Sequence, residues 1–193
     1  MRQNGLRQYL QDLSLHILDI AENSIRAGAK NIEIKITEDL KKDLLIIEIT
    51  DDGKGMDKEF AEKALDPFVT TRTERKVGLG LSLFAEAARM SSGYLEIRSN
   101  PQKGTKVQAT FQHSHIDRKP LGDVGSTLLT LIAGNPQIDF TYCHTKDGME
   151  FRLSSREIKA QLQDNDLASP EGLKVLRKAV KKNLREFLRR SVA

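Results

Sequence analysis

Residues 18–34 read LDIAENSIRAGAKNIEI, an amphipathic helix that turns directly into a strand. In the helix, apolar residues between Leu10 and Ile25 fall on one broad arc, as expected for a helix lying on a core. The opposite arc is polar and contains Asp12, His16, Asp19, Glu22, Asn23 and Arg26. A polar arc normally faces water, so the remaining sequence has to show whether this one faces a ligand instead.

The composition is that of an ordinary soluble protein, with 38% hydrophobic and 30% charged residues among 193. No apolar run approaches the roughly 20 residues that a transmembrane helix needs, and the first residues lack the apolar core of a signal peptide. The single cysteine, Cys143, excludes an internal disulfide framework and a cysteine-ligated metal site, and we expect it to be a buried structural thiol. A cytoplasmic protein fits these features.

The sequence predicts two domains joined by a linker at residues 113–122. Residues 1–112 read as the helix above, two strands, two helices and two further strands, which predicts an α/β (α+β sandwich) fold: a mixed, mostly antiparallel sheet covered on one face by helices. Residues 123–193 predict a small α-β-β-α-α domain, with a hairpin turn at Asp147-Gly148 and helix starts at Ser154 and Ser169. His113 and His115 are expected to be linker residues.

The excess positive charge belongs to the last helix. From residue 170 onward there are eight Lys or Arg against two Glu, while the rest of the chain is slightly acidic. The apolar stripe of this helix is expected to dock on the protein's own core, and it comprises Leu173, Leu176, Val180, Leu184 and Phe187. The basic face is either solvated or a docking surface for an acidic protein or a membrane; with few aromatic residues and no recognised motif, nucleic acid is not expected.

Three loops have the composition of a nucleotide site. Asp51-Asp52-Gly53-Lys54-Gly55 places a carboxylate at the end of an apolar strand, where it would accept a hydrogen bond from an exocyclic amine, and two glycines that let the backbone approach a flat ligand. Gly78-Leu79-Gly80 opens a helix whose free N–H groups suit phosphate. Lys103-Gly104-Thr105 supplies a hydroxyl. Each loop alone is also explained by a simple turn.

Taken in order, ENSIRAGA, DDGKGM, DPFVTTR, GLGLSLFAEAARMSSG and GTKVQATF resemble the successive motifs of the ATP-binding domain of histidine kinases. That domain is part of the superfamily of gyrase, heat-shock chaperone and mismatch-repair ATPases, and the resemblance covers about residues 10–112. It implies that the polar arc of the first helix faces Mg-ATP. The implied nucleotide-binding residues are Asn23, Arg26, Asp51, Gly53, Gly55, Met56, Phe68, Thr71, Gly78, Leu79, Gly80, Leu81 and Thr105.

The resemblance also implies roles for these residues. Asn23 would coordinate Mg²⁺ through its side-chain oxygen, Asp51 would accept the adenine amino proton, and Thr105 would share the adjacent water. Phe68 and residues 70–76 would form a short lid, whose basic side chains either bind phosphate or are merely solvated. Asp19, one turn before Asn23, would be either a general base or a residue that positions the metal shell.

The sequence lacks one part of a complete histidine kinase, the helical hairpin that carries the phosphorylated histidine. None of the four histidines is followed by an acidic residue. His16 is expected either to pair with Asp19 or to be a partly buried helix residue at the edge of the pocket. The resemblance therefore favours a stand-alone signalling kinase that transfers the γ-phosphoryl group of ATP to a separate protein partner. The alternative is a switch that binds or slowly hydrolyses ATP. The partner and the oligomeric state stay open.

Overall fold

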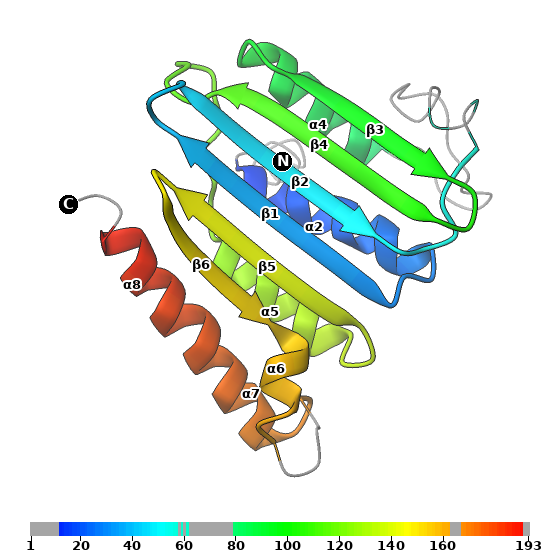
Figure 1. Cartoon of the computed structure of the whole chain (residues 1–193), viewed down its shortest axis with the longest axis vertical. Helices are drawn as coiled ribbons and strands as arrows, with labels where there is room; N and C mark the ends of the chain where they lie inside the picture. The colour runs from blue at the N-terminus through cyan, green and yellow to red at the C-terminus, as the bar shows by residue number, and fades with distance from the viewer. Residues whose placement is uncertain (1–11, 58, 60, 62–78, 163–166, 191–193) are drawn as a thin grey trace, which may run out of the picture.

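The computed structural model describes residues 12–57, 59, 61, 79–162 and 167–190. Its centre is a six-stranded sheet of order β3-β4-β2-β1-β5-β6 (Figure 1). The strands are β1 Asn31–Asp39, β2 Leu44–Asp51, β3 Tyr94–Asn100, β4 Gly104–Gln112, β5 Asp139–Lys146 and β6 Met149–Ser154. Only the β1–β5 pair is parallel among these neighbours. The predicted mixed, mostly antiparallel sheet is therefore confirmed.

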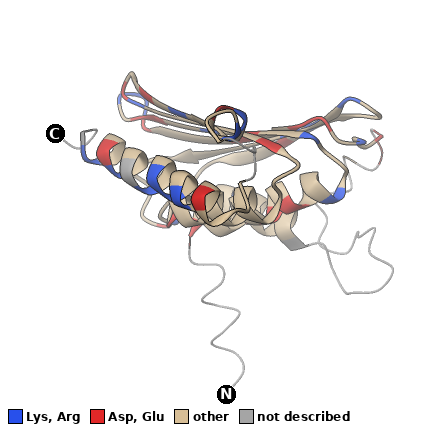
Figure 2. Ribbon diagram, turned by 90° about the horizontal axis from the view of Figure 1, so that it is seen from below, with Lys and Arg blue, Asp and Glu red and all other residues tan. Residues whose placement is uncertain are grey.

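The helices lie on one face of the sheet, as Figure 2 shows from the side. They are α2 Leu13–Arg26, α4 Leu79–Met90, α5 Val124–Gly134, α6 Ser155–Lys159, α7 Pro170–Arg177, the π-helical turn η1 Lys178–Lys182 and α8 Asn183–Arg190. The first of the two helices predicted between the strand pairs falls on residues 57–65. It lies outside the described residues apart from single positions, and so does the lid predicted over 70–76.

Strand alternation creates the two faces of the sheet. In β1 and β2, every second side chain is buried under the helices, and Ile34 and Ile47 are fully buried. The other face carries charged pairs such as Lys106 Nζ with Glu48 Oε2 at 2.6 Å. One face thus forms the core and the other meets solvent, the usual arrangement of a mostly antiparallel sheet.

The second predicted domain continues the same sheet. β5 lies beside β1 in parallel register, with Ile36 opposite His144, and Leu128, Phe140 and Leu176 of this part are in one hydrophobic cluster with the isoleucines of β1. The domain boundary at residues 113–122 stays a prediction, but the segment is more than a connector. His113 Nε2 lies 2.9 Å from Oε2 of the buried Glu38.

Local signals in this part are confirmed. Asp147 and Gly148 both have positive φ and turn the β5–β6 hairpin. The hydroxyl of Ser154 accepts a hydrogen bond from the Glu157 amide at the start of α6, and that of Ser169 caps α7. In the apolar stripe of the last helix, Leu176, Val180, Leu184 and Phe187 are buried in the core as expected, whereas Leu173 is only half-buried.

One expectation was wrong. Cys143 is only half-buried, because strand alternation places its neighbours Tyr142 and His144 on the covered face of β5 and leaves Cys143 on the other face. The long last helix is present, but it contains the π-helical turn η1 between α7 and α8. A heptad-like stripe fixes which side faces the core, but it does not reveal one extra residue in a turn.

Candidate functional site

A buried carboxylate marks the end of β2. Asp51 is 8% exposed. Its Oδ2 accepts a hydrogen bond from Ser24 Oγ at 2.6 Å, and its Oδ1 accepts one from the Gly53 amide at 2.9 Å. Ser24 belongs to α2, so these bonds fix the carboxylate between the helix and the loop that follows β2. Sequence reasoning missed Ser24, because it assigned polar residues of this helix to the outer arc.

The glycines after Asp51 are required by close packing. A Cβ at Gly53 would come within 3.0 Å of both Cβ and O of Ala27. Gly55 has φ +65°, and a Cβ there would collide with the Asn100 carbonyl. The loop therefore lies pressed between the end of α2 and the β3–β4 turn, and backbone atoms form much of the surface beside Asp51.

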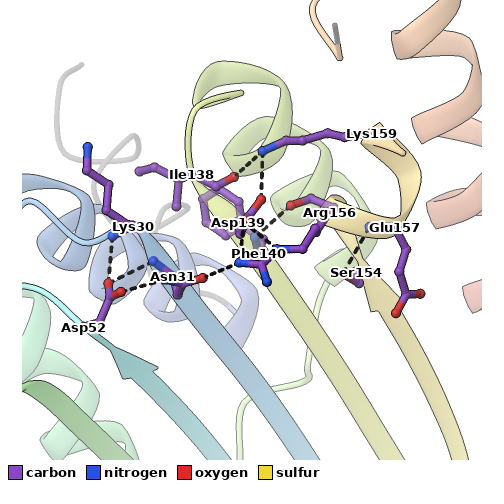
Figure 3. Close-up of polar contacts among 11 residues, drawn as sticks. Lys30, Asn31, Asp52, Ile138, Asp139, Phe140, Ser154, Arg156, Glu157 and Lys159 are labelled. Carbon is purple, nitrogen blue, oxygen red and sulfur yellow. Dashed lines mark hydrogen bonds and ion pairs between the residues drawn. The ribbon is translucent and has the colours of Figure 1, made fainter. Parts of the chain in front are cut away.

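Asp52 anchors the same loop to the start of β1 (Figure 3). Its Oδ1 accepts from the amides of Lys30 and Asn31 at 2.7 and 2.9 Å, and its Oδ2 accepts from the Asn31 side chain at 2.7 Å. Burial would raise the pKa of Asp52, but the hydrogen bonds from Asn31 and Lys30 outweigh it and hold the pKa below its usual value. This orienting role was not predicted.

Thr105 lies directly across from Asp51, since the two residues are partners in the β2–β4 register. Its hydroxyl is 2.8 Å from Ser99 Oγ, which also accepts from the Met56 amide at 2.8 Å. Thr105, Asp51 and Met56 are thus brought together as predicted. Ser99, which links them, was missed.

The outer arc of α2 lies beside the first turn of α4. A Cβ at Gly80 would be 3.3 Å from Asp19 Cβ and 3.7 Å from its Oδ2, so the carboxylate is next to the positive end of the α4 dipole. One turn further, Asn23 Oδ1 accepts from Arg26 Nη2 at 2.5 Å, and Arg26 also pairs with Glu22 at 3.2 Å. Asp19, Asn23 and Arg26 are all exposed, as their predicted roles require.

His16 departs from the predicted polar arc. It is 1% exposed and stacks on Phe84 of α4, with ring centroids 5.2 Å apart and planes at 14°. Burial lowers the pKa of His16 to about 4, assisted by the charge of Lys119 and opposed by Asp12. Asp12 caps α2 through the Leu15 amide. Both residues therefore belong to the scaffold, which a helical wheel does not distinguish from a ligand-facing arc.

The rest of the predicted site is placed only in part. Leu79 is the first residue of α4, and Leu81 packs against the core. Phe68, Thr71 and Gly78 lie outside the described residues. Within the part of the chain that the structure describes, no group of three or more His, Cys, Asp or Glu side chains could hold a metal.

The fold and this arrangement define a nucleotide-binding α/β sandwich with a buried acceptor between a helix and a glycine loop. Residues 2–115 match the family described as histidine kinase-, DNA gyrase B-, and HSP90-like ATPase. The chain belongs to this family, and it therefore carries an ATP-binding domain of the kind predicted.

Curated relatives share this domain. The chain is 32% identical over 112 residues to the non-motile and phage-resistance protein of Caulobacter vibrioides, covering 53% of this chain and 13% of that protein. It is 34% identical over 95 residues to the signal transduction histidine-protein kinase ArlS of Staphylococcus aureus, covering 47% and 21%. The chain thus spans about a fifth or less of these relatives. None of the described helices is long and apolar enough to span a membrane.

Similarity to solved structures extends over most of the chain. The N-terminal domain of a DNA repair protein matches with a TM-score of 0.56 and 19% identity, covering 90% of this chain and 58% of that one. The overlap extends beyond the residues that the family model matches. At this identity it supports the fold alone, including strands and helices after residue 115.

Proposed function

We propose that the protein binds Mg-ATP between α2 and the loops after β2 and before α4, and transfers the γ-phosphoryl group to a separate protein. The observation that carries the proposal is the position of Asp51. A carboxylate that is nine-tenths buried and bonded to neutral donors retains lone pairs for one further donor, which suits an adenine amino group. Thr105 and the backbone of Gly53 lie beside Asp51, where they would contact the edge of the adenine ring.

Asn23 and Arg26 fit the phosphate end. Mg²⁺ prefers oxygen ligands and keeps several waters, so one amide oxygen from the protein is enough beside the phosphates. In the described structure that oxygen accepts from Arg26. Because a metal ion and a guanidinium repel one another, metal binding would turn Arg26 away from Asn23 and toward the negative phosphates.

Asp19 is the candidate for proton transfer. It lies one turn before Asn23 and beside the start of α4, so an acceptor hydroxyl or a water near the γ-phosphate would be within its reach. Mg²⁺, when bound, would neutralise charge on the phosphates. Asp19 would polarise the nucleophile, while the α4 N-terminus and Arg26 hold the phosphates in place.

A second candidate function is a nucleotide-dependent switch without transfer. A polar chain favours it, because it links the Asp51 loop to the C-terminal part. Asp52 holds Asn31, Asn31 Oδ1 accepts from Arg156 Nη2 at 3.1 Å, and Arg156 Nε donates to Asp139 at 2.8 Å (Figure 3). A bound nucleotide that moves the Asp51–Gly55 loop would therefore also move α6.

Incubation with γ-labelled Mg-ATP, with and without a lysate of the source cells, separates the two. A kinase leaves label on a protein, a hydrolysing switch releases free phosphate, and a binding switch does neither. Asn23→Ala should lose both products, whereas Asp19→Asn should retain ATP binding and lose turnover. Glu33→Gln on the open face of the sheet is the matched control. Absence of ATP binding by the wild-type protein would reject both functions.

A further inference from the structure

A cavity of about 120 Å³ in the C-terminal part of the chain is lined by no residue of the loops that hold Asp51. Its walls come from three separate segments: the start of α5, strand β5, and the helix formed by η1 and α8. Gly125, Val180 and Leu184 belong to its walls, Tyr142 and His144 to its floor, and Lys181 and Arg185 to its rim. The walls are mainly aliphatic, while the floor and the rim are polar.

The floor is a buried hydrogen-bonded relay. His144 Nε2 lies 2.9 Å from Glu38 Oε1, and His144 Nδ1 lies 3.0 Å from Tyr142 Oη. Burial raises the pKa of Glu38, but hydrogen bonds from His144 and His113 and the charge of Lys146 bring it to about 2. The ionised Glu38 fixes the proton on His144 Nε2, so Nδ1 accepts from the tyrosine hydroxyl. Lys146 Nζ, 4.0 Å from Glu38 Oε2, balances the carboxylate, so the floor presents no net negative charge to the cavity.

The rim is positive. Lys181 and Arg185 are exposed, and within the described part of the chain neither has an ion-pair partner within 4.0 Å. Asp123 is nearby, but both of its oxygens bind Ser126, at 2.9 Å to the amide and 2.6 Å to the hydroxyl. These bonds, and then the charges of Lys181 and Arg185, lower the pKa of Asp123. Among the residues that line the cavity, two cations and one carboxylate leave one net positive charge.

The irregular turn of the last helix is at this cavity. Val180 in the wall and Lys181 on the rim both belong to η1. Single π-helical turns are rare and occur often at functional sites, because the extra residue redirects side chains. Across from it, Gly125 brings α5 close: a Cβ there would be 3.6 Å from both Val180 and Leu184.

We propose that this cavity binds a small organic monocarboxylate, its apolar body between α5 and the last helix and its carboxylate at Lys181 and Arg185. A cavity of about 150 Å³ admits benzene, so the body has roughly four to six non-hydrogen atoms. The single positive charge of the rim matches a monoanion. Glu38, which is bonded to His144 in the floor of the cavity, lies opposite Leu45 in the β1–β2 register, six residues before Asp51. At 3.3 Å per residue, the site is therefore about 20 Å from Asp51.

The test is a titration of the full chain with isovalerate, followed by amide chemical shifts, beside isovaleramide as the uncharged match. Isovalerate should shift Gly125, Tyr142 and His144 while leaving Asp51 unmoved, and isovaleramide should bind at least tenfold more weakly. Arg185→Gln should weaken isovalerate about tenfold, since it removes a charged hydrogen bond. Lys174→Gln, an exposed cation on the same helix away from the cavity, should not.

Three outcomes would overturn the proposal. They are no saturable shift in the wild-type protein, equal binding of the uncharged amide, and equal loss in the Arg185 and Lys174 variants, which would indicate only a general attraction to a basic helix. Because Arg185 is exposed, its variant is expected to fold, and unchanged ATP binding would verify this independently.

Discussion

Two buried carboxylates lie on the same covered face of the sheet, at opposite ends of paired strands. Asp51 and Glu38 are 8% and 7% exposed. Asp51 accepts only from neutral donors, a serine hydroxyl and a backbone amide. Glu38 is enclosed by His144 and His113, each at 2.9 Å, with Lys146 Nζ at 4.0 Å.

The difference separates a binding carboxylate from a structural one. Both groups lose hydration on folding, and each must recover that cost from its partners. Glu38 recovers it inside the protein, from groups on β5 and on the segment after β4, so it fastens the C-terminal part to β1. Asp51 recovers less of its lost hydration energy, because its partners are uncharged. A further hydrogen-bond donor from a ligand would satisfy the remaining lone pairs of the carboxylate.

Glu38→Gln should produce the largest effect on stability. Removing the charge from a buried group that is paired with histidines should lower the free energy of unfolding by about 3 kcal/mol or more, measured by urea denaturation. ATP affinity of the folded variant should stay unchanged. Glu33→Gln on the open face of the same strand should change stability by about 0.5 kcal/mol at most; equal losses in the two variants would contradict a structural role for Glu38.

The pH dependence of stability should separate His16 from Glu38. The pKa of His16 falls from 6.5 to about 4 on folding, so the unfolded chain binds a proton that the folded one excludes. Stability is complete above pH 6.5 and should decrease by about 3 kcal/mol as the pH falls toward 4. The pKa of Glu38 is lowered from 4.5 to about 2, so its contribution is lost only below pH 4.5.

His16→Phe is the variant that isolates this effect, because it keeps a ring on Phe84 and cannot titrate. Its unfolding free energy should be nearly flat between pH 6.5 and 4.5, where the wild-type curve descends. A wild-type curve that is flat over the same interval would show that the folded protein protonates His16 without cost.

Asp51→Asn should affect binding more than stability. The amide keeps one acceptor but presents an NH₂ group in place of the second oxygen, so a charged hydrogen bond to adenine is lost. ATP affinity should fall about 10- to 100-fold, measured by calorimetry. GTP affinity serves as the internal control, because the guanine edge offers an oxygen where adenine has its amine, and it should not fall with ATP affinity.

Much of this site could be predicted because the chemistry is local. The run from Asp51 to Gly55 indicates, within five residues, the end of a strand, a hydrogen-bond acceptor and two glycines where the backbone packs closely. The position of Thr105 follows from strand pairing. Ser24 and Ser99 could not be found in this way. In a sequence, a serine on the inner face of a helix or strand is read as a small residue that the core accepts. Its role as a hydrogen-bond donor becomes visible only when its partner is known.

The C-terminal part could be predicted only as a list of elements. Its helices and hairpin have clear turn and capping signals, but nothing in residues 139–146 says that they pair in parallel with β1. That contact depends on side chains distant in sequence, such as His144 and Glu38. The relay and the cavity above it follow from this pairing, so neither was accessible from periodicity.

Ser24→Ala should give the smallest effect and the sharpest distinction between the two carboxylates. The hydroxyl orients Asp51 but carries no charge, so its loss should lower ATP affinity about fivefold, corresponding to about 1 kcal/mol for a neutral hydrogen bond. Ser14→Ala is the matched control, since Ser14 is also buried in α2 and bonds to Asp12 instead.

Both serine variants should lose a similar, small amount of stability in urea denaturation. Only Ser24→Ala should weaken ATP. If both weaken ATP equally, the effect comes from the packing of α2 and not from Asp51. If neither does, the carboxylate is held by Gly53 alone, and the helix contributes to the adenine site only through its exposed arc.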